Sequence, residues 1–340
     1  MAARTTLMDV ARHCGVSRAT VSLVLNDSPL VAEQTAKRVR QAMSELGYVY
    51  NRAAASLRTR RSDAIGVVMT QITNPYFAEF AAGLQDVVTD SGTVPLLAIS
   101  GEDRELQHRL VKSLVERNVD GIVLIPAHGT KADDLPDLLG TPLVLMARRL
   151  PDAELDYVGA QNRAGGYAAA EHLYGHGCRA IAFVGGFADA SAREERAGGV
   201  SAFLTERGLM LDEDRSVMCQ PLRAPAREAA MRLLTENSEV DGIVCFNDVV
   251  AFGVLDAIAD LGLRVGSDVR VIGFDDVHDA GLNRPSLSSV AVPARGTGRR
   301  AAQLVLERAA GSTAPTVREE FPTKLQPRET CGCPRPQSLT

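Results

Sequence analysis

Residues 6–26, TLMDVARHCGVSRATVSLVLN, predict two short helices joined by a tight turn. Four apolar residues of the first helix have the i, i+3, i+4, i+7 spacing of one helix face; they are Leu7, Val10, Ala11 and Cys14. Gly15 interrupts this pattern, and Ser17 is a residue type that caps helix N-termini. A second helix is therefore expected over residues 18–26.

The second helix has an apolar face and an outward face. Val21, Val24 and Leu25 share the apolar face. The side chains expected to point away from it are those of Arg18, Ala19, Ser22 and Leu23. Two helices joined by a glycine turn are typical of a helix-turn-helix, whose second helix lies in the major groove of DNA. A small helical hairpin without DNA contacts is the alternative interpretation.

The charge distribution favours DNA binding. Residues 1–61 contain ten Lys and Arg against four Asp and Glu, a net charge of +6, whereas the remaining residues carry −11. The net charge of −5 for the whole chain therefore conceals a basic N-terminal segment on an acidic body. The basic segment suits a phosphate backbone, and the body would be repelled by it.

A third helix is expected over residues 32–46, with Gly47 at its end. Its capping position is Ala32, a poor capping residue that forgoes about 1 kcal/mol. Residues 51–60 can form a further helix, but a lone helix this short is marginal in water. We expect this segment to be disordered alone and to fold when it is held against DNA and a partner chain.

After residue 63 the pattern changes to apolar runs that alternate with helical stretches. The predicted strands span 64–70, 94–100, 121–126, 142–146, 180–184, 242–246, 269–274 and 289–292. Nearly continuous apolar runs indicate parallel strands buried on both faces, and the strand–helix alternation predicts open α/β sheets. VDGIVLIP at 119–126 recurs as VDGIVCFN at 240–247, which favours two similar α/β subdomains with a ligand cleft at the carboxyl ends of their strands.

The chain has 340 residues, 45% of them apolar and 23% charged, a composition typical of globular proteins. It has no apolar N-terminal signal segment and no run of ~18 apolar residues, so we expect a cytoplasmic protein without membrane contact.

Three local patterns are set aside. Gly296-Thr-Gly-Arg-Arg-Ala301 matches a dinucleotide fingerprint, but no complete βαβ unit follows it. His172 and His176 are four residues apart on a helix, and no third metal ligand is evident. Cys331-Gly-Cys333 lacks the C-x₂-C spacing of zinc sites. We therefore expect no cofactor and no metal, and the sequence has no recognisable catalytic constellation.

Several motifs together resemble the lactose-repressor/galactose-repressor (LacI/GalR) family of bacterial transcription regulators. They are MDVA at 8–11, GVSRATVS at 15–22, ELGY at 45–48, NR at 51–52, NPYF at 74–77, VDG at 119–121, FND at 246–248 and VIGFDD at 271–276. The resemblance covers residues 5–327. It implies an all-α helix-turn-helix headpiece and a core of two parallel-sheet subdomains like the periplasmic sugar-binding proteins (type I).

The family architecture divides the chain as follows. The headpiece is expected at residues 1–50, a hinge helix at 51–61, the effector-binding and dimerisation core at 62–330 and a tail at 331–340. Within the core, the N-subdomain is expected at 62–162 and 292–320, and the C-subdomain at 163–291 and 321–330.

The resemblance also implies the DNA contacts. These are expected from Thr6, Ser17, Arg18, Ala19, Thr20, Ser22, Leu23, Asn26, Tyr48, Asn51, Arg52, Ala54 and Leu57. Arg18 could bond a guanine and Leu23 could meet a thymine methyl group, unless Leu23 is a buried residue at the headpiece edge. Leu57 matches the wedge that two hinge helices insert in the minor groove. A homodimer on a palindromic operator of roughly 14–20 base pairs follows.

The effector positions implied by the resemblance are Tyr76, Phe77, Ser191, Arg196, Asn247 and Asp275, with Arg193 as a further candidate. Such side chains fit a small polar, sugar-like ligand, although Asn247 and Asp275 could instead cap helices. The chain departs from the family at Ala164, where an acid is common, and at Pro221, where a stacking aromatic is expected. An acidic or unusual ligand therefore stays open.

The sequence thus predicts a ligand-responsive DNA-binding regulator, a repressor rather than an enzyme. A solute-binding receptor for transport is the alternative, and it would need an export signal and no basic headpiece. An enzyme on the α/β scaffold is a third possibility that lacks a catalytic constellation.

Overall fold

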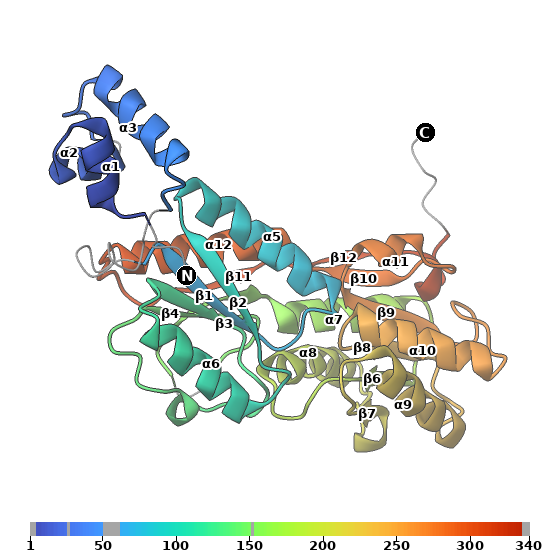
Figure 1. The fold of residues 1–340 in the computed structure, drawn as a ribbon. Helices are drawn as coiled ribbons and strands as arrows, with labels where there is room; N and C mark the ends of the chain where they lie inside the picture. The colour runs from blue at the N-terminus through green and yellow to red at the C-terminus, as the bar shows by residue number, and fades with distance from the viewer. Residues whose placement is uncertain (1–4, 26–27, 50–61, 151–152, 335–340) are drawn as a thin grey trace. The chain divides into compact units, whose positions relative to one another are not determined.

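The computed structural model describes residues 5–25, 28–49, 62–150 and 153–334 (Figure 1). The chain divides into two compact units, Met1–Ser62 and Asp63–Thr340, which we describe separately. Across the described ranges, no helix combines the length and the apolar character needed to cross a membrane.

The smaller unit contains the predicted helix-turn-helix and a third helix. Its helices are α1 (Leu7–Cys14), α2 (Arg18–Leu25) and α3 (Glu33–Glu45). Thr6 caps α1 in a reciprocal pair with Asp9, and Gly15 ends α1 in the left-handed conformation. The buried core consists of Val10, Ala11, Cys14, Val21, Val24, Ala36, Val39 and Ala42. Ala32 precedes α3 without a side-chain capping bond, as predicted.

The larger unit begins with a six-stranded parallel sheet in the order β11-β5-β4-β3-β1-β2. Its strands are β1 (Ala64–Met69), β2 (Val94–Ile99), β3 (Gly121–Leu124), β4 (Leu143–Met146), β5 (Asp156–Ala160) and β11 (Arg318–Phe321). The helices α5 (Pro75–Asp90) and α12 (Ala294–Ala309) cover one face, and α6 (Arg104–Glu116) covers the other (Figure 1).

A second six-stranded sheet has the order β12-β10-β9-β8-β6-β7. Its strands are β6 (Ile181–Val184), β7 (Ser216–Val217), β8 (Gly242–Cys245), β9 (Arg270–Asp275), β10 (Ser288–Ala291) and β12 (Lys324–Gln326). β12 pairs antiparallel with β10, and the other described pairs are parallel. The accompanying helices are α7 (Asn162–Gly175), α8 (Ser191–Glu206), α9 (Arg223–Glu236), α10 (Asp248–Asp260) and α11 (His278–Leu282), with the short helices η1 (Ala132–Asp134), η2 (Glu213–Arg215) and η3 (Glu329–Cys331).

The repeated sequence segments occupy equivalent places in the two sheets. The VDGIV repeats contain β3 and β8, each of which is fourth in its strand order. The chain passes from the first sheet to the second after β5, returns after β10, and crosses again between β11 and β12. The fold class predicted from the sequence, a helical headpiece and two parallel-sheet α/β subdomains, is confirmed.

All eight predicted strands are present, but four further strands were not expected. β7 has two residues and β12 has three, whereas β11 is a charged edge strand with the sequence REEF. β5 is buried, and its sequence DYVGA lacks a continuous apolar run. The expectation of burial on both faces is wrong for β2, because this edge strand leaves Val94 and Leu97 half exposed.

Glycines let the paired helices approach closely. A Cβ atom added at Gly298 in α12 would lie 2.1 Å from the Phe80 carbonyl oxygen in α5, and one added at Gly83 would lie 2.1 Å from the Arg295 oxygen. Gly166 and Gly199 have the same relation between α7 and α8. Gly298 in the fingerprint-like segment is therefore a helix-packing residue.

We predict that Gly298→Ala lowers the thermal unfolding midpoint, because the added methyl overlaps the α5 backbone at a typical cost of about 1–3 kcal/mol. Gly296→Ala is the matched control, since its added Cβ would meet no atom closer than 3.6 Å. Alanine is the better helix former by about 1 kcal/mol, so the control should be neutral or stabilising. Equal midpoints for the two variants, measured by calorimetry, would contradict the packing role.

Candidate functional site

The outward face of α2 presents polar and apolar side chains to solvent. Ser17, Arg18 and Ala19 are exposed, and Leu23 is 36% exposed, so it is not a buried edge residue. Ser17 Oγ accepts a hydrogen bond of 3.0 Å from the backbone N–H of Thr20 and so caps the helix. These positions match the predicted base-recognition side of a helix-turn-helix.

The remaining predicted DNA-contact residues differ in their exposure to solvent. Thr20, Ser22 and Tyr48 are half-buried, and exposed Thr6 uses its hydroxyl in the α1 cap. The predicted contacts that lie outside the described residues are Asn26, Asn51, Arg52, Ala54 and Leu57.

Five of the six predicted effector residues line one small cavity in the larger unit. Tyr76 and Phe77 lie in the first turn of α5, Arg196 lies in α8, Asn247 caps α10, and Asp275 ends β9. The cavity has a volume of about 30 Å³ and contains residues from both subdomains. A drug-sized ligand typically needs about 300 Å³ or more, so the cavity is nearly filled by its own side chains.

The Arg196 side chain occupies the centre of this group. Its Nε donates to Asn162 Oδ1 at 2.8 Å and its Nη1 donates to the Phe246 carbonyl oxygen at 2.5 Å. The guanidinium carbon lies 3.7 Å from the centroid of the Phe274 ring, a cation–π arrangement. Burial lowers the pKa of Arg196, and the nearby Asp275 carboxylate opposes that shift.

Asp275 is the buried carboxylate that faces Arg196 across 3.9 Å. Asn74 Nδ2 donates to Asp275 Oδ2 at 3.2 Å, a bond that joins the N-subdomain to the C-subdomain. Burial raises the pKa of Asp275 to about 6, although Arg196 and Asn74 both act to lower it. Its φ of 107° is unusual for a residue other than glycine, and such backbone strain is concentrated at functional sites.

Asn247 has one side-chain role inside the fold. Its Oδ1 accepts from the Val250 N–H at 3.0 Å, which caps α10. Capping uses the oxygen, and the amide group could still donate to a ligand. Tyr76 and Phe77 contact edge to face with ring centroids 5.5 Å apart, and burial raises the pKa of Tyr76.

Ser191 and Arg193 lie elsewhere. Ser191 Oγ accepts from the Arg149 N–H at 2.8 Å and lines a separate cavity of about 450 Å³. Arg193 donates through Nε to the Gly185 carbonyl oxygen at 3.0 Å and also bonds Ser216, so it is bound within its own subdomain.

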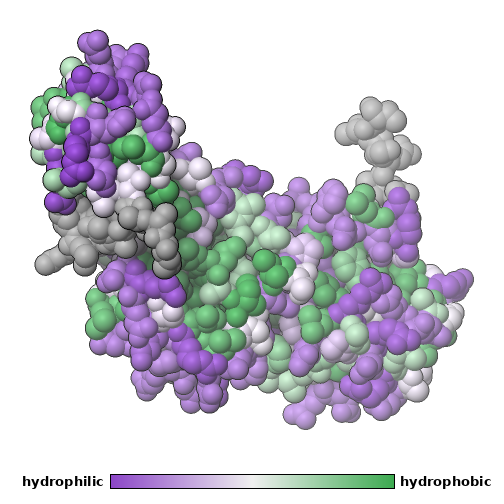
Figure 2. Space-filling model, viewed as in Figure 1, coloured by the Kyte–Doolittle hydropathy of each residue, from purple (hydrophilic) through white to green (hydrophobic). Residues whose placement is uncertain are grey.

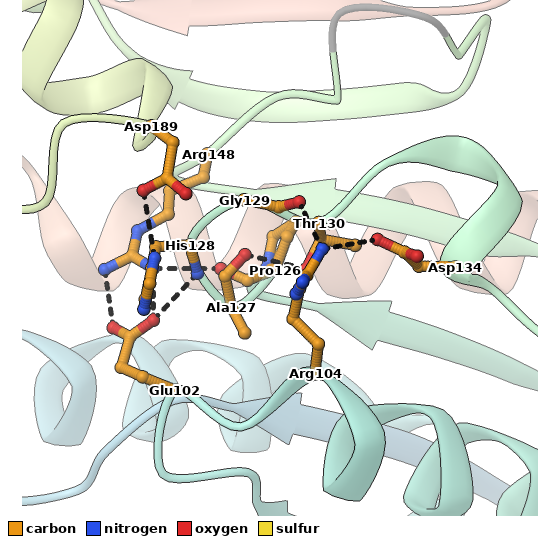
Figure 3. A network of polar contacts seen from close by, with 10 residues as sticks. All are labelled: Glu102, Arg104, Pro126, Ala127, His128, Gly129, Thr130, Asp134, Arg148 and Asp189. Atoms are coloured by element: carbon orange, nitrogen blue, oxygen red, sulfur yellow. Dashed lines mark hydrogen bonds and ion pairs between the residues drawn. The ribbon is translucent and has the colours of Figure 1, made fainter.

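A polar network that the sequence analysis did not identify borders the larger cavity (Figure 3). Arg148 Nη2 donates to Glu102 Oε1 at 2.7 Å, and Arg148 Nη1 donates to the Pro126 carbonyl oxygen at 3.0 Å. His128 Nδ1 lies 2.9 Å from Asp189 Oδ1, across the two subdomains. Glu102, His128 and Arg148 follow β2, β3 and β4, so their location after strand ends could have identified them.

Arg148 connects the two cavities because it lines both of them. Nearby, Arg149 pairs with Glu195 of α8, and Glu195 also accepts from Asn162 Nδ2 at 2.8 Å. We call the region lined by the two cavities the cleft. Its charged and amide groups bond to one another, and each could instead bond to a polar ligand.

Comparison with known proteins identifies the family. Residues 6–51 match the model of bacterial regulatory proteins of the lacI family, and residues 170–331 match a periplasmic binding protein-like domain. The ribose operon repressor of Halalkalibacterium halodurans is 32% identical over 96% of this chain and 97% of its own length. This chain belongs to the lacI family.

Other members of the lacI family extend the comparison. The transcriptional regulator CelR of Thermobifida fusca is 35% identical over 96% of this chain and 98% of its own length. A structure of a CelR–cellobiose complex has a TM-score of 0.73 at 32% identity and covers 96% of this chain and all (100%) of its own. A structure of a lac repressor dimer bound to operator has a TM-score of 0.85 at 24% identity. The match covers 97% of this chain and 99% of the lac repressor chain, so the two chains share the fold.

We predict that the ionisation of Asp275 makes the free energy of unfolding fall as pH rises from about 4 to about 6. The native carboxyl with a pKa of about 6 holds its proton in this window, whereas an unfolded aspartate with a pKa near 3.9 has lost it. Each pKa unit corresponds to about 1.4 kcal/mol, so the contribution is on the order of 2–3 kcal/mol.

Calorimetric unfolding of wild type and Asp275→Asn between pH 4 and 7 measures this contribution. The stability difference between the two proteins should shift in favour of the variant as pH rises. A difference that stays constant with pH would show that Asp275 does not titrate in this window.

Proposed function

We propose that this lacI-family protein is a transcriptional repressor that binds a palindromic operator as a homodimer and responds to a small sugar-like ligand. Like its named relatives, it is a transcriptional regulator and not an enzyme. One observation carries the ligand proposal: the buried Arg196 and Asp275 line a small cavity together with residues of the other subdomain, Tyr76 and Phe77 among them. Double-stranded DNA, the ligand and a second copy of the chain are the proposed partners.

The dimer proposal is supported by the exposed apolar edge of the first sheet. Val94, Leu96, Leu97 and Ile99 of β2 are between 37% and 50% exposed, and Figure 2 shows apolar surface gathered over this strand. An apolar edge strand of this kind is normally covered by a partner. The matching lac repressor structure is a dimer on operator, and an isologous contact would give this chain the two-fold symmetry of a palindrome.

The ligand proposal requires the cleft to rearrange. A sugar has several hydroxyl groups that could replace the Asn74–Asp275 bond and share the donors of Arg196. The cavity of about 450 Å³ adjoins this group through Arg148 and offers room for a ligand of that size. The cellobiose complex of the related CelR supports a sugar as the ligand class.

Coupling to DNA follows from the division of the chain. We place the hinge at residues 51–61, between a headpiece at 1–50 and a core at 62–330. A ligand that favours one arrangement of the two subdomains would shift the population of operator-competent dimers. An inducer would lower operator affinity, and a corepressor would raise it.

A gel shift of the full-length protein on DNA upstream of its own gene tests this function. Binding that selects one site and weakens steeply with salt is expected from phosphate contacts by a basic headpiece. A transport receptor or an enzyme would not select a site, so equal affinity for all duplexes would contradict the proposal.

We predict that Arg18→Ala weakens operator binding by about 1–3 kcal/mol, the range for one bidentate base contact. Anisotropy titrations of labelled operator measure this loss. Arg109→Ala, which removes the same charge from an exposed position of α6, is the matched control and should bind normally. If both variants lose equal affinity, net charge and not base recognition explains the loss.

We predict that Asn247→Ser weakens ligand binding without lowering the unfolding midpoint, because serine keeps a capping oxygen and removes the amide donor. Calorimetric titration of cellobiose and related sugars gives the affinity. Asn247→Ala, which loses the cap as well, is the comparison and should lose stability by about 1 kcal/mol. Unchanged sugar affinity in the serine variant would restrict Asn247 to its capping role.

A further inference from the structure

Two pairs of potential metal ligands that are far apart in the sequence lie together beside α7. His172 and His176 lie at the C-terminal end of α7, Cys331 ends η3, and Cys333 follows two residues later. One potential ligand atom from each of the four lies within 4.8 Å of all the others. The two pairs are about 160 residues apart along the chain. No third metal ligand is therefore evident in the sequence near the histidines, and the cysteines supply the missing two only in the folded chain.

The distances have the dimensions of a tetrahedral site. His172 Nε2 lies 3.2 Å from Cys331 Sγ and 3.7 Å from Cys333 Sγ, and His176 Nε2 lies 3.4 Å from Cys333 Sγ. Zinc bonds of about 2.0–2.1 Å to nitrogen and about 2.3 Å to sulfur place tetrahedral ligand atoms roughly 3.3–3.8 Å apart. The four side chains therefore require little movement to share one ion.

The backbone places both cysteines on the same side. Gly332 between them has a φ of 89°, which favours glycine, and a Cβ added there would lie 2.8 Å from the Gly266 carbonyl oxygen. Neighbouring bonds fix this turn: Ser286 Oγ donates to Glu329 Oε2 at 2.7 Å, and Thr330 Oγ1 donates to the Val271 carbonyl oxygen at 2.8 Å. The cysteines are thus presented by a well-bonded turn.

We propose that His172, His176, Cys331 and Cys333 bind one Zn²⁺ ion as a structural site that fastens the C-terminal segment to α7. Four protein ligands complete a tetrahedron and leave no position for a substrate, which is typical of structural zinc. Binding releases the two thiol protons, and two thiolates with two neutral imidazoles neutralise the ion. The half-buried site then needs no counter-ion.

This proposal replaces the expectation, drawn from each pair separately, that neither binds a metal. A disulfide between Cys331 and Cys333 is the competing chemistry, and it would leave the paired histidines without a role.

Metal binding can be measured directly on the full-length protein, kept reduced with a non-chelating reductant. We expect about one Co²⁺ per chain, with a thiolate-to-cobalt charge-transfer band and the strong visible bands of a tetrahedral site, and displacement of both by Zn²⁺. Cys333→Ser and His176→Gln should each weaken Co²⁺ binding by at least about 100-fold. Mutating a residue that only hydrogen-bonds to a metal ligand already lowers metal affinity about 10–100-fold.

Cys219→Ser and His278→Gln are the matched controls, because both residues lie in the same subdomain outside the cluster. These controls should bind Co²⁺ like wild type, and Zn²⁺ should raise the unfolding midpoint of wild type but not of Cys333→Ser. Reduced wild-type protein that takes up no Co²⁺, or Cys333→Ser that binds it equally well, would overturn the proposal. Cys333 is partly exposed, so its serine variant is expected to fold.

Discussion

The buried guanidinium of Arg196 is the group on which the organisation of the core depends. It connects α8 to Asn162 at the start of α7, to the end of β8 through the Phe246 carbonyl oxygen, and to Asp275 at the end of β9. A buried charge is tolerated only when such partners surround it. Asn74 extends the same network to the N-subdomain, so the state of this network and the arrangement of the two subdomains depend on each other.

Much of this architecture could be predicted from the sequence because its signals are local. The helix-turn-helix follows from apolar spacing and Gly15. Four of the predicted cleft residues lie at strand ends or helix starts, as in other open α/β sheets, and they are Tyr76, Phe77, Asn247 and Asp275. The strands β5 and β11 could not be predicted, because a charged or glycine-containing segment becomes a strand only when a neighbour pairs with it.

Contacts between distant segments were equally inaccessible. Nothing local relates Arg148 to Glu102, or His172 to Cys331, until the sheets are assembled and the C-terminal segment returns to α7. α7 then carries Asn162 of the cleft at one end and the two histidines at the other. Gly166 of α7 and Gly199 of α8 bring these two helices into close contact near the Asn162 end.

The central claim is that ligand in the cleft and operator on the headpiece are coupled through one dimer. The most direct measurement determines operator affinity with and without a saturating sugar, and sugar affinity with and without operator, in the same buffer. Because linkage is reciprocal, both affinities should change by the same factor, in a range of about 5–150-fold. A sugar that binds the wild-type core while operator affinity stays constant would contradict the account.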